Sequence, residues 1–266
     1  MLTRWITRGY LAYLALPMAL LLVGSLGSLW LNTLLPTGVT TKWYADVASD
    51  PSFRRAFVSS LVVAASTAAG CVVVGLPLAW AVYRSRAPRV RALVRVVTQL
   101  PVALPAIVLA FGFVLVFSSD TLPWLGSRGL LIAGHLIVCL PYFLHTVLAD
   151  MRRLGLDTLE DAAESLGAHR WQRFVFIVVP AVRHSVFAGL IVVVALSIGE
   201  FQFSNLVAGF LNRTYPVVLL QAFYGATGFA CAATVILLVL ALVASGLGAF
   251  TARGAGQRAV AVPGIG

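Results

Sequence analysis

Ionisable and polar side chains inside apolar segments are the first candidates for chemistry in this sequence. Glu200 is the one acidic residue within a long apolar run, and polar residues follow it closely. Placing a charge inside a membrane costs about 2.5–3.5 kcal/mol, so we expect Glu200 to face a bundle interior or a wet cavity. The candidates for a solute pathway or its gate are Glu200, Phe201, Gln202 and Asn205. The alternative is a structural hydrogen bond from Glu200 to a helix terminus or an Arg.

Histidine and cysteine are the other residues that could bind a metal or act as nucleophiles. His135 and His145 are ten residues apart in one apolar run, toward opposite ends of a predicted helix. We interpret both as packed or hydrogen-bonded residues and not as metal ligands. The cysteines lie in apolar stretches without paired spacing, as small buried residues do: Cys71, Cys139 and Cys231. We therefore expect no metal site and no catalytic residue.

A long polar connection, Asp150–His184, separates two apolar runs and predicts a helix–glycine–helix element. Asp157 and Glu160 have the spacing of a capping box, so the first helix is predicted to begin at Thr158. Gly167 can adopt the left-handed conformation that ends a helix, and we expect the first helix to stop there.

The surface of this helix–glycine–helix element favours a docking role. The first predicted helix has a small, flat apolar face formed by Ala162, Ala163 and Leu166. The second predicted helix places on one face Trp171, Phe174 or Val175, and Val178. Pro180 is predicted to end it. Small residues let a partner approach the backbone closely; the alternative is an amphipathic linker that lies on the membrane surface.

Composition shows which elements position these residues. Hydrophobic residues make up 60% of the 266 residues, charged residues 11%, and the mean hydropathy is +0.96. A soluble domain carries about 25% charged residues, so lipid must cover this apolar surface. The uncharged runs that predict membrane spans are Gly9–Leu31, Phe57–Tyr83, Val97–Phe117, Gly129–Ala149, Ser185–Leu211 and, after a short helix at Val217–Tyr224, about Phe229–Phe250.

The basic residues predict the orientation of the spans. With both termini in the cytoplasm, 14 of the 19 basic residues lie on the inner side and 5 on the outer side. The net charge of +10 is therefore typical of a membrane protein, and we expect no nucleic-acid partner.

The run from Gly9 is too long for a signal peptide, so we expect an uncleaved first span. Pro101 and Pro105 predict a bend near the start of the third span.

The polar connection resembles a motif of a known family. Asp161-Ala162-Ala163, followed by Gly167 and Val179-Pro180, is similar to the EAA motif of binding-protein-dependent permeases, the membrane subunits of type I ABC importers. Asp161 replaces the motif's glutamate and Val179 its leucine. The resemblance covers roughly Phe57–Phe250 and includes the Gly199-Glu200-Phe201 stretch.

This resemblance implies an all-α membrane protein with six transmembrane helices in a type I importer permease bundle. We expect a first helix and periplasmic loop in residues 1–56, a core permease domain in residues 57–250 with a coupling loop at 150–184, and a cytoplasmic tail at 251–266. The residues that the resemblance assigns to ATPase coupling are Asp161, Ala162, Ala163, Leu166, Gly167, Trp171 and Pro180.

The resemblance also implies partners in the bacterial inner membrane. They are two copies of an ABC ATPase, a second permease subunit that is homologous or identical, a periplasmic solute-binding protein, and membrane lipid. The sequence has no G-x-x-x-x-G-K-[ST] motif, so we expect this chain to bind no cofactor and a separate subunit to use ATP.

The solute is less constrained than the family. Gly199-Glu200-Phe201 is similar to a stretch in the phosphonate, polyamine, ferric-iron and thiamine branches. We rank a phosphonate (such as 2-aminoethylphosphonate) or a polyamine first, and ferric iron or thiamine second. A secondary transporter or channel would need inverted-repeat halves with broken helices. A membrane enzyme would need a convergent cluster of His, Asp or Ser. Neither pattern is found in the sequence.

Overall fold

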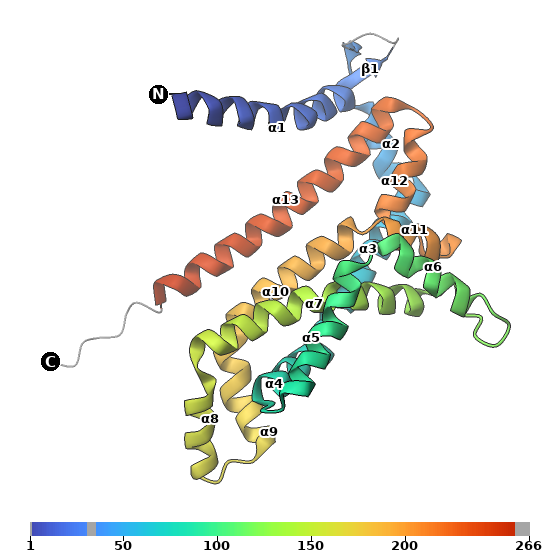
Figure 1. Ribbon diagram of the computed structural model, residues 1–266. Helices are drawn as coiled ribbons and strands as arrows, with labels where there is room; N and C mark the ends of the chain where they lie inside the picture. The colour runs from blue at the N-terminus through green and yellow to red at the C-terminus, as the bar shows by residue number, and fades with distance from the viewer. Residues whose placement is uncertain (1, 31–35, 259–266) are drawn as a thin grey trace.

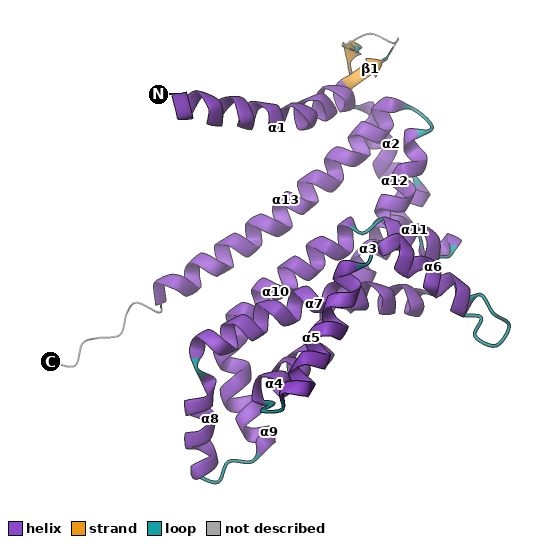
Figure 2. Ribbon diagram, viewed as in Figure 1, coloured by secondary structure: helices purple, strands orange, loops and turns teal. Residues whose placement is uncertain are grey.

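The computed structural model describes residues 2–30 and 36–258, with the side chains of residues 4–30 and 36–243. Helices form nearly all of this part, as predicted for the all-α class; a short antiparallel hairpin of β1 (Gly27–Leu29) and β2 (Thr37–Val39) is the exception (Figure 2). The helices are α1 (Leu2–Leu26), α2 (Lys42–Ser49), α3 (Pro51–Gly70), α4 (Leu76–Arg84), α5 (Pro88–Ala103), α6 (Ala106–Phe117), α7 (Arg128–Leu154), α8 (Leu156–Ser165), α9 (Arg170–Arg173), α10 (Val179–Gly199), α11 (Gln202–Val207), α12 (Tyr215–Phe223) and α13 (Thr227–Arg258). Two π-helical segments, η1 (Cys71–Gly75) and η2 (Phe174–Val178), and one 3-10 turn, η3 (Phe210–Asn212), complete the described helices.

Length and composition identify the membrane-crossing helices. Four are long and apolar enough in the described part of the chain: Arg4–Leu26, Pro51–Arg84, Arg128–Leu154 and Arg170–Gly199. The pair α5 and α6 gives a fifth if it is one broken span. The sixth predicted span lies in α13, whose described apolar part, Thr227–Val243, is shorter. The exact number of six therefore stays a prediction.

The ends of these helices separate into two sides (Figure 1). The start of α1, the end of α13, and α8 with α9 lie toward the left of the view. The β1–β2 hairpin and the connection from α6 to α7 lie toward the right. The two helical arms of the Asp150–His184 loop, α8 and α9, thus share a side with both ends of the described chain. Residues 251–258 of the predicted tail continue α13, and residues 259–266 lie outside the described residues.

The fifth predicted span, Ser185–Leu211, is wrong in its limits. The helix begins at Arg170, runs through η2 into α10 and ends at Gly199. Glu200 has an extended backbone with ψ 116°, and its carboxylate binds the start of α11. Uncharged residues continue beyond this break, which is why hydropathy alone did not locate it.

The first predicted span, Gly9–Leu31, also ends earlier than expected. Helix α1 stops at Leu26 because Gly27 pairs with Val39 in the hairpin. The indole nitrogen of Trp43 donates a hydrogen bond of 2.8 Å to the carbonyl oxygen of Gly27. These contacts come from residues ten or more positions away, so an apolar run cannot reveal them.

The predicted bend in the third span is confirmed. Helices α5 and α6 meet at 99°, with Leu104 and Pro105 extended between them. Leu104 precedes a proline, and this position disfavours the helical conformation. Pro101 is accommodated inside α5, so Pro105 marks the break.

The core lies where α7 crosses the helix of α3, η1 and α4 on one side and α10 on the other. Phe143 of α7 is fully buried at this crossing. A Cβ atom on Gly75 would lie 2.8 Å from its ring, and one on Gly189 would lie 3.0 Å away. Glycines at these positions let three helices approach closely, which is how membrane helices gain packing contacts.

Candidate functional site

The first arm of the Asp150–His184 loop, α8, begins at a left-handed glycine. Gly155 has φ 58° and ends α7, and α8 starts at Leu156, two residues before the predicted start. The predicted capping box is absent: no side chain caps α8, and Tyr83 Oη accepts a hydrogen bond of 3.2 Å from the Asp157 N–H. The spacing of Asp157 and Glu160 was misleading because Glu160 points into the protein, where it has other partners.

The predicted end of the first arm is confirmed at Gly167. This glycine has φ 84°, in the left-handed region. The Gly167 N–H bonds to the Glu164 carbonyl at 2.9 Å, and the Ala168 N–H bonds to the Ala163 carbonyl at 2.9 Å. This pair of bonds is a Schellman motif, which satisfies the last carbonyls of α8. A Cβ atom at Gly167 would meet nothing within 4 Å, so its requirement is conformational and not steric.

The second arm is one continuous helix with the following span. Helix α9 passes through η2 into α10, and Pro180 lies at the start of α10. The prediction that Pro180 ends the second arm is therefore wrong. The Val179 N–H bonds to the Phe174 carbonyl, five residues back. This wide turn makes room for the proline ring, which would otherwise collide with a carbonyl of the preceding turn.

The predicted apolar face of the second arm is divided between the core and the surface. Phe174 and Val178 are buried, with 8% and 0% of their surface exposed, whereas Trp171 is 70% exposed. The ring of Trp171 lies 5.8 Å from that of Phe174. The wide turn η2 changes the helical repeat between these positions, so regular spacing did not predict their sides.

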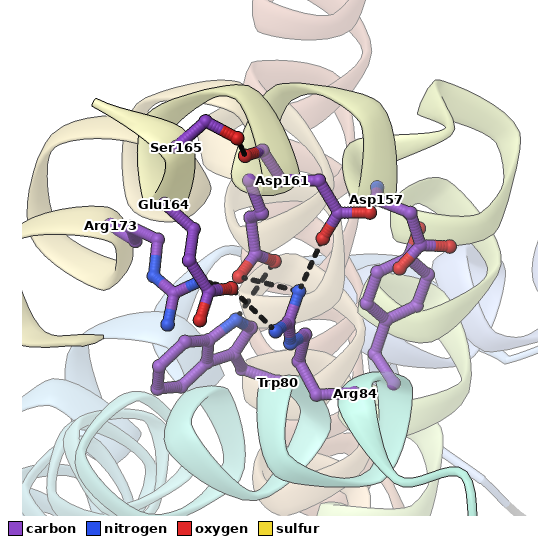
Figure 3. Close-up of polar contacts among 9 residues, drawn as sticks. Trp80, Arg84, Asp157, Asp161, Glu164, Ser165 and Arg173 are labelled. Atoms are coloured by element: carbon purple, nitrogen blue, oxygen red, sulfur yellow. Dashed lines mark hydrogen bonds and ion pairs between the residues drawn. The ribbon is translucent and has the colours of Figure 1, made fainter. Parts of the chain in front are cut away.

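A charged cluster beneath α8 fixes the first arm (Figure 3). Arg84, the last residue of α4, lies 3.7 Å from Glu160 Oε2, 3.4 Å from Asp161 Oδ1 and 3.4 Å from Glu164 Oε2. Arg173 of α9 pairs with Glu164 from the other side. We call the following set the Arg84 cluster: Trp80, Arg84, Glu160, Asp161, Glu164 and Arg173. It joins α4, α8 and α9.

Glu160 is the buried acid of the Arg84 cluster. Its side chain has no solvent exposure, and its Oε1 accepts a hydrogen bond of 3.0 Å from the indole nitrogen of Trp80. The Trp80 ring packs against Phe174, with 5.1 Å between centroids. A buried carboxylate requires a paired charge and hydrogen bonds. Glu160 therefore ties α8 directly to α4 and, through the contact of Trp80 with Phe174, to the start of the span that contains α10.

The ion pairs that Glu164 makes in the Arg84 cluster depend on pH. The hydrogen bond and charge of Arg173, with a smaller contribution from Arg84, lower the pKa of the Glu164 carboxyl. A pKa that is lower in the folded than in the unfolded state stabilises the fold above the unfolded value. That stabilisation is lost as the pH falls through the lower folded pKa. The Glu164 contacts are therefore present at neutral pH.

The outer side of α8 is apolar and exposed. Leu159, Ala162 and Leu166 follow the spacing of one helix face, and we call them the α8 face. Leu159 is 54% exposed and Leu166 89% exposed, while Ala163 is half-buried. The Arg84 cluster holds the opposite side of α8. Of the residues expected to couple, Asp161 lies in the cluster, and Ala162 and Leu166 lie on the α8 face.

The sequence does not reveal five members of this site. Arg84 is one of the basic residues that flank a span, and Glu160 has the spacing of a capping box. No sequence pattern distinguishes Trp80, Glu164 and Arg173. The signal that could have found Glu160 is its place between Leu156 and Ala163 on one helix side. Its pairing with Arg84 depends on the packing of α8 on α4, which no local pattern contains.

The pathway candidates lie elsewhere, at the break between α10 and α11. Glu200 Oε1 accepts a hydrogen bond of 2.8 Å from the Phe203 N–H, and Oε2 accepts one of 2.9 Å from the Ser204 N–H. This is the bond to a helix terminus that the structural alternative expected. Gln202 and Asn205 are exposed and Phe201 is half-buried. A role of these four residues in the solute pathway stays a prediction.

A buried polar network continues from Glu200 into the bundle. Glu200 Oε2 accepts a hydrogen bond from Ser204 Oγ at 3.0 Å, and Ser204 Oγ lies 2.9 Å from His135 Nε2. His135 Nδ1 lies 2.8 Å from Ser197 Oγ. The network thus joins α7, α10 and α11. His135 is hydrogen-bonded as predicted, and His145 lies 3.0 Å from Gln99.

Metal binding has no support in the described part of the chain. No group of three or more His, Cys, Asp or Glu side chains there could hold an ion. The three cysteines are buried and free.

Comparison with known proteins identifies relatives along most of the chain. Residues 71–256 match the family described as "Binding-protein-dependent transport system inner membrane component". The "Spermidine/putrescine transport system permease protein PotC" of Escherichia coli is 31% identical over 241 residues, covering 87% of this chain and 86% of PotC. The "Putative 2-aminoethylphosphonate transport system permease protein PhnV" of Salmonella typhimurium is 23% identical over 235 residues, covering 88% and 87%.

Solved structures show the same fold. A chain of a bacterial ABC transporter involved in the import of the acidic polysaccharide alginate aligns with a TM-score of 0.70 at 16% identity, covering 98% of this chain and 99% of that chain. A chain of the MetNI methionine ABC transporter, in an inward-facing conformation, aligns with a TM-score of 0.63 at 16% identity, covering 75% and 94%.

Proposed function

The chain belongs to the family of binding-protein-dependent transport system inner membrane components, and from this membership we propose that α8 couples solute passage to a separate ATPase. The chain is a permease subunit of an ABC importer in the inner membrane, a transport component and not an enzyme. Coupling through α8 requires two things of this element: a surface that a partner can bind, and a rigid link from that surface to the spans.

The observation that carries the proposal is that α8 has both. The α8 face exposes Leu159 and Leu166 outside the apolar spans, where burial by a partner would be favourable. On the opposite side, Glu160 and Arg84 tie α8 to the end of α4. A displacement of α8 would therefore move α4. It would also move α9 through the ion pair of Glu164 with Arg173, and α9, η2 and α10 form one continuous helix, so the span that contains α10 would move as well.

The assembly that fits this site has several subunits. We infer two copies of an ABC ATPase, a second permease subunit that is homologous or identical, a periplasmic solute-binding protein and surrounding lipid. ATP would be used by the ATPase, and this chain would bind no cofactor. Both termini and the Asp150–His184 loop would face the cytoplasm, as the distribution of basic residues favours.

For the solute we propose a phosphonate, such as 2-aminoethylphosphonate, or a polyamine. Support comes from the printed functions of PhnV and PotC, which are similar to this chain along most of its length. Ferric iron or thiamine is the second choice. Glu200, Phe201, Gln202 and Asn205 would lie on the pathway or at its gate. Competition among these solutes for ATP-dependent uptake into proteoliposomes distinguishes them.

The coupling proposal is tested by one charge on the α8 face. Leu166→Asp places a carboxylate on a residue that is 89% exposed, so it should leave membrane insertion unchanged. Val39→Asp is the matched control, because Val39 is 85% exposed in the hairpin on the other side. We expect Leu166→Asp to abolish co-purification of the ATPase and its stimulated hydrolysis, and Val39→Asp to preserve both. Wild-type docking by Leu166→Asp would refute the proposed docking surface.

A further inference from the structure

A second basic site lies between α5 and α7, next to the Arg84 cluster. One of its arginines, Arg91, also lines a neighbouring hollow with Arg84 and Asp161. A cavity of about 750 Å³ opens there. Three arginines line it, two from α5 and one from α7: Arg91, Arg95 and Arg152. Arg91 and Arg95 are four residues apart and so share one face of α5. The cavity also includes Pro88, the first residue of α5, where the helix dipole adds positive potential.

These arginines have no acidic partner among the residues whose side chains the structure describes. The ion pairs in that part of the chain involve other arginines: Arg84, Arg153 and Arg173. The contrast is clear at neighbouring positions. Arg153 pairs with Asp150 at 2.8 Å, while Arg152 turns to the cavity. Among the described side chains, no acidic residue lines the cavity.

The usual excess of arginine on the cytoplasmic side does not explain this arrangement. That excess concerns how many basic residues flank a span. It does not require three of them to line one hollow without a counter-charge. Like charges held close together repel, and an anion bound between them would remove the repulsion. Guanidinium groups are suited to phosphate oxygens, to which they donate paired hydrogen bonds.

The remainder of the cavity wall defines the ligand further. Its apolar side comes from α4, α5 and α7, with Val82, Val94, Leu144 and Leu148. Thr98 and His145 also line the cavity, and His145 Nε2 lies 3.0 Å from Gln99 Nε2, which joins the two helices. An anionic head beside the arginines and a short apolar portion against this wall would fit together.

We propose that this cavity binds a phosphate or phosphonate group. The group could belong to a small anionic solute or to the headgroup of an anionic phospholipid, and the recognition chemistry is the same. A polyamine would meet three positive charges and would be excluded. This site is independent of the α8 face, so it can be tested without an ATPase.

The test uses the full chain in phosphatidylcholine nanodiscs, titrated calorimetrically with inorganic phosphate, 2-aminoethylphosphonate and spermidine. Replacing the three arginines together, by Arg91→Gln, Arg95→Gln and Arg152→Gln, should weaken binding of the anions at least about tenfold, because each loses charge-assisted hydrogen bonds. Arg89→Gln is the control, since Arg89 is exposed on α5 but does not line the cavity. It should change the affinity by less than about twofold, as expected for an exposed charge that water and salt screen.

A charge-preserving variant separates binding from folding. The triple replacement by Lys should recover part of the affinity for phosphate, while the Gln variant should keep the wild-type melting temperature. A second arm identifies the source of the anion. If the natural ligand is a lipid, native mass spectrometry of protein from phosphatidylglycerol membranes will show retained phosphatidylglycerol, and the Gln variant will lose it. If it is a solute, 2-aminoethylphosphonate will bind equally well in phosphatidylcholine and phosphatidylglycerol nanodiscs.

The proposal is overturned if the wild type and the triple Gln variant show the same affinity for phosphate and 2-aminoethylphosphonate and the same retention of phosphatidylglycerol. Equal weakening by Arg89→Gln would overturn it as well, because the effect would then come from overall charge. Wild-type ATPase docking by Leu166→Asp, with anion binding intact, would count against the proposed coupling function alone.

Discussion

At the scale of single residues, two adjacent carboxylates of α8 have different environments. Glu160 is fully buried and receives the Trp80 indole hydrogen bond, while the Asp161 side chain is 61% exposed. Both lie near the same guanidinium, that of Arg84. Removing one partner of a buried pair leaves an uncompensated group, whereas an exposed pair is screened by water. Substitutions at the two positions therefore compare a buried and an exposed carboxylate that share one partner, Arg84.

We predict that Glu160→Ala loosens α8 and that Asp161→Ala does not. Glu160→Ala leaves the Trp80 indole N–H without an acceptor and should lower the local stability of α8 by about 1–3 kcal/mol. Asp161→Ala should cost less than about 1 kcal/mol. Hydrogen exchange of the amides in residues 156–166 measures both. Exchange in Glu160→Ala at the wild-type rate would show that the Arg84 cluster does not hold α8.

At the scale of elements, the ends of α8 and α11 depend on different devices. Helix α8 ends through the left-handed backbone of Gly167, where a Cβ atom would have free space. Helix α11 begins at the Glu200 carboxylate, which accepts two backbone N–H bonds. A left-handed backbone penalises most side chains whatever the space around them. A carboxylate at a helix start satisfies donors that would otherwise be unpaired.

We predict an order of tolerance at Gly167 that follows the backbone and not the side-chain volume. Asn accepts the left-handed region more readily than Ala or Val. Gly167→Asn should therefore retain most ATPase docking, Gly167→Ala less, and Gly167→Val least, with a backbone cost of about 1 kcal/mol or more. Membrane abundance should stay near wild type in all three. Better docking by Ala than by Asn would instead indicate that the partner's proximity, and not the backbone, limits this position.

Glu200 is predicted to act through the start of α11. Glu200→Ala removes both acceptors and should cost about 1–2 kcal/mol of local stability, as loss of a helix cap does. Glu200→Gln keeps one oxygen and should cost less. If this role limits transport, uptake should fall in the same order for every solute that the importer accepts. Changed solute preference without a change in hydrogen exchange of residues 202–207 would indicate direct solute contact instead.

At the scale of the whole molecule, the arrangement of the helix ends makes the topology testable. Helices α8 and α9 lie on the same side as the start of α1 and the end of α13, and the hairpin lies on the other side (Figure 1). Val39 in the hairpin is 85% exposed, and Ala168 lies between α8 and α9. The native cysteines are buried and free, so they give little background to a thiol reagent.

We predict opposite labelling of Ala168→Cys and Val39→Cys by an impermeant maleimide. In right-side-out vesicles, Val39→Cys should react and Ala168→Cys should not. In inside-out vesicles the result should reverse. Labelling of Ala168→Cys from the periplasmic side would contradict the proposed orientation and, with it, an ATPase at α8.

The sequence by itself determined the membrane class, the proline-directed bend and the glycine that ends α8, because each follows from composition or local backbone chemistry. Apolar length requires lipid, Pro105 restricts the backbone of Leu104, and Gly167 has the conformational freedom that its turn needs. These properties depend on residues near one another in the chain.

Only the tertiary structure decided where the fifth span ends, that Pro180 continues its helix, and what Glu160 does. Glu160 and Asp157 have capping-box spacing, yet Glu160 is drawn into a pocket formed by Trp80 and Arg84, 80 and 76 positions away. The cavity between α5 and α7 likewise combines Arg91 and Arg95 with the distant Arg152. A local pattern fixes the backbone that a residue prefers, but the partner of a buried charge is set by which helices pack together.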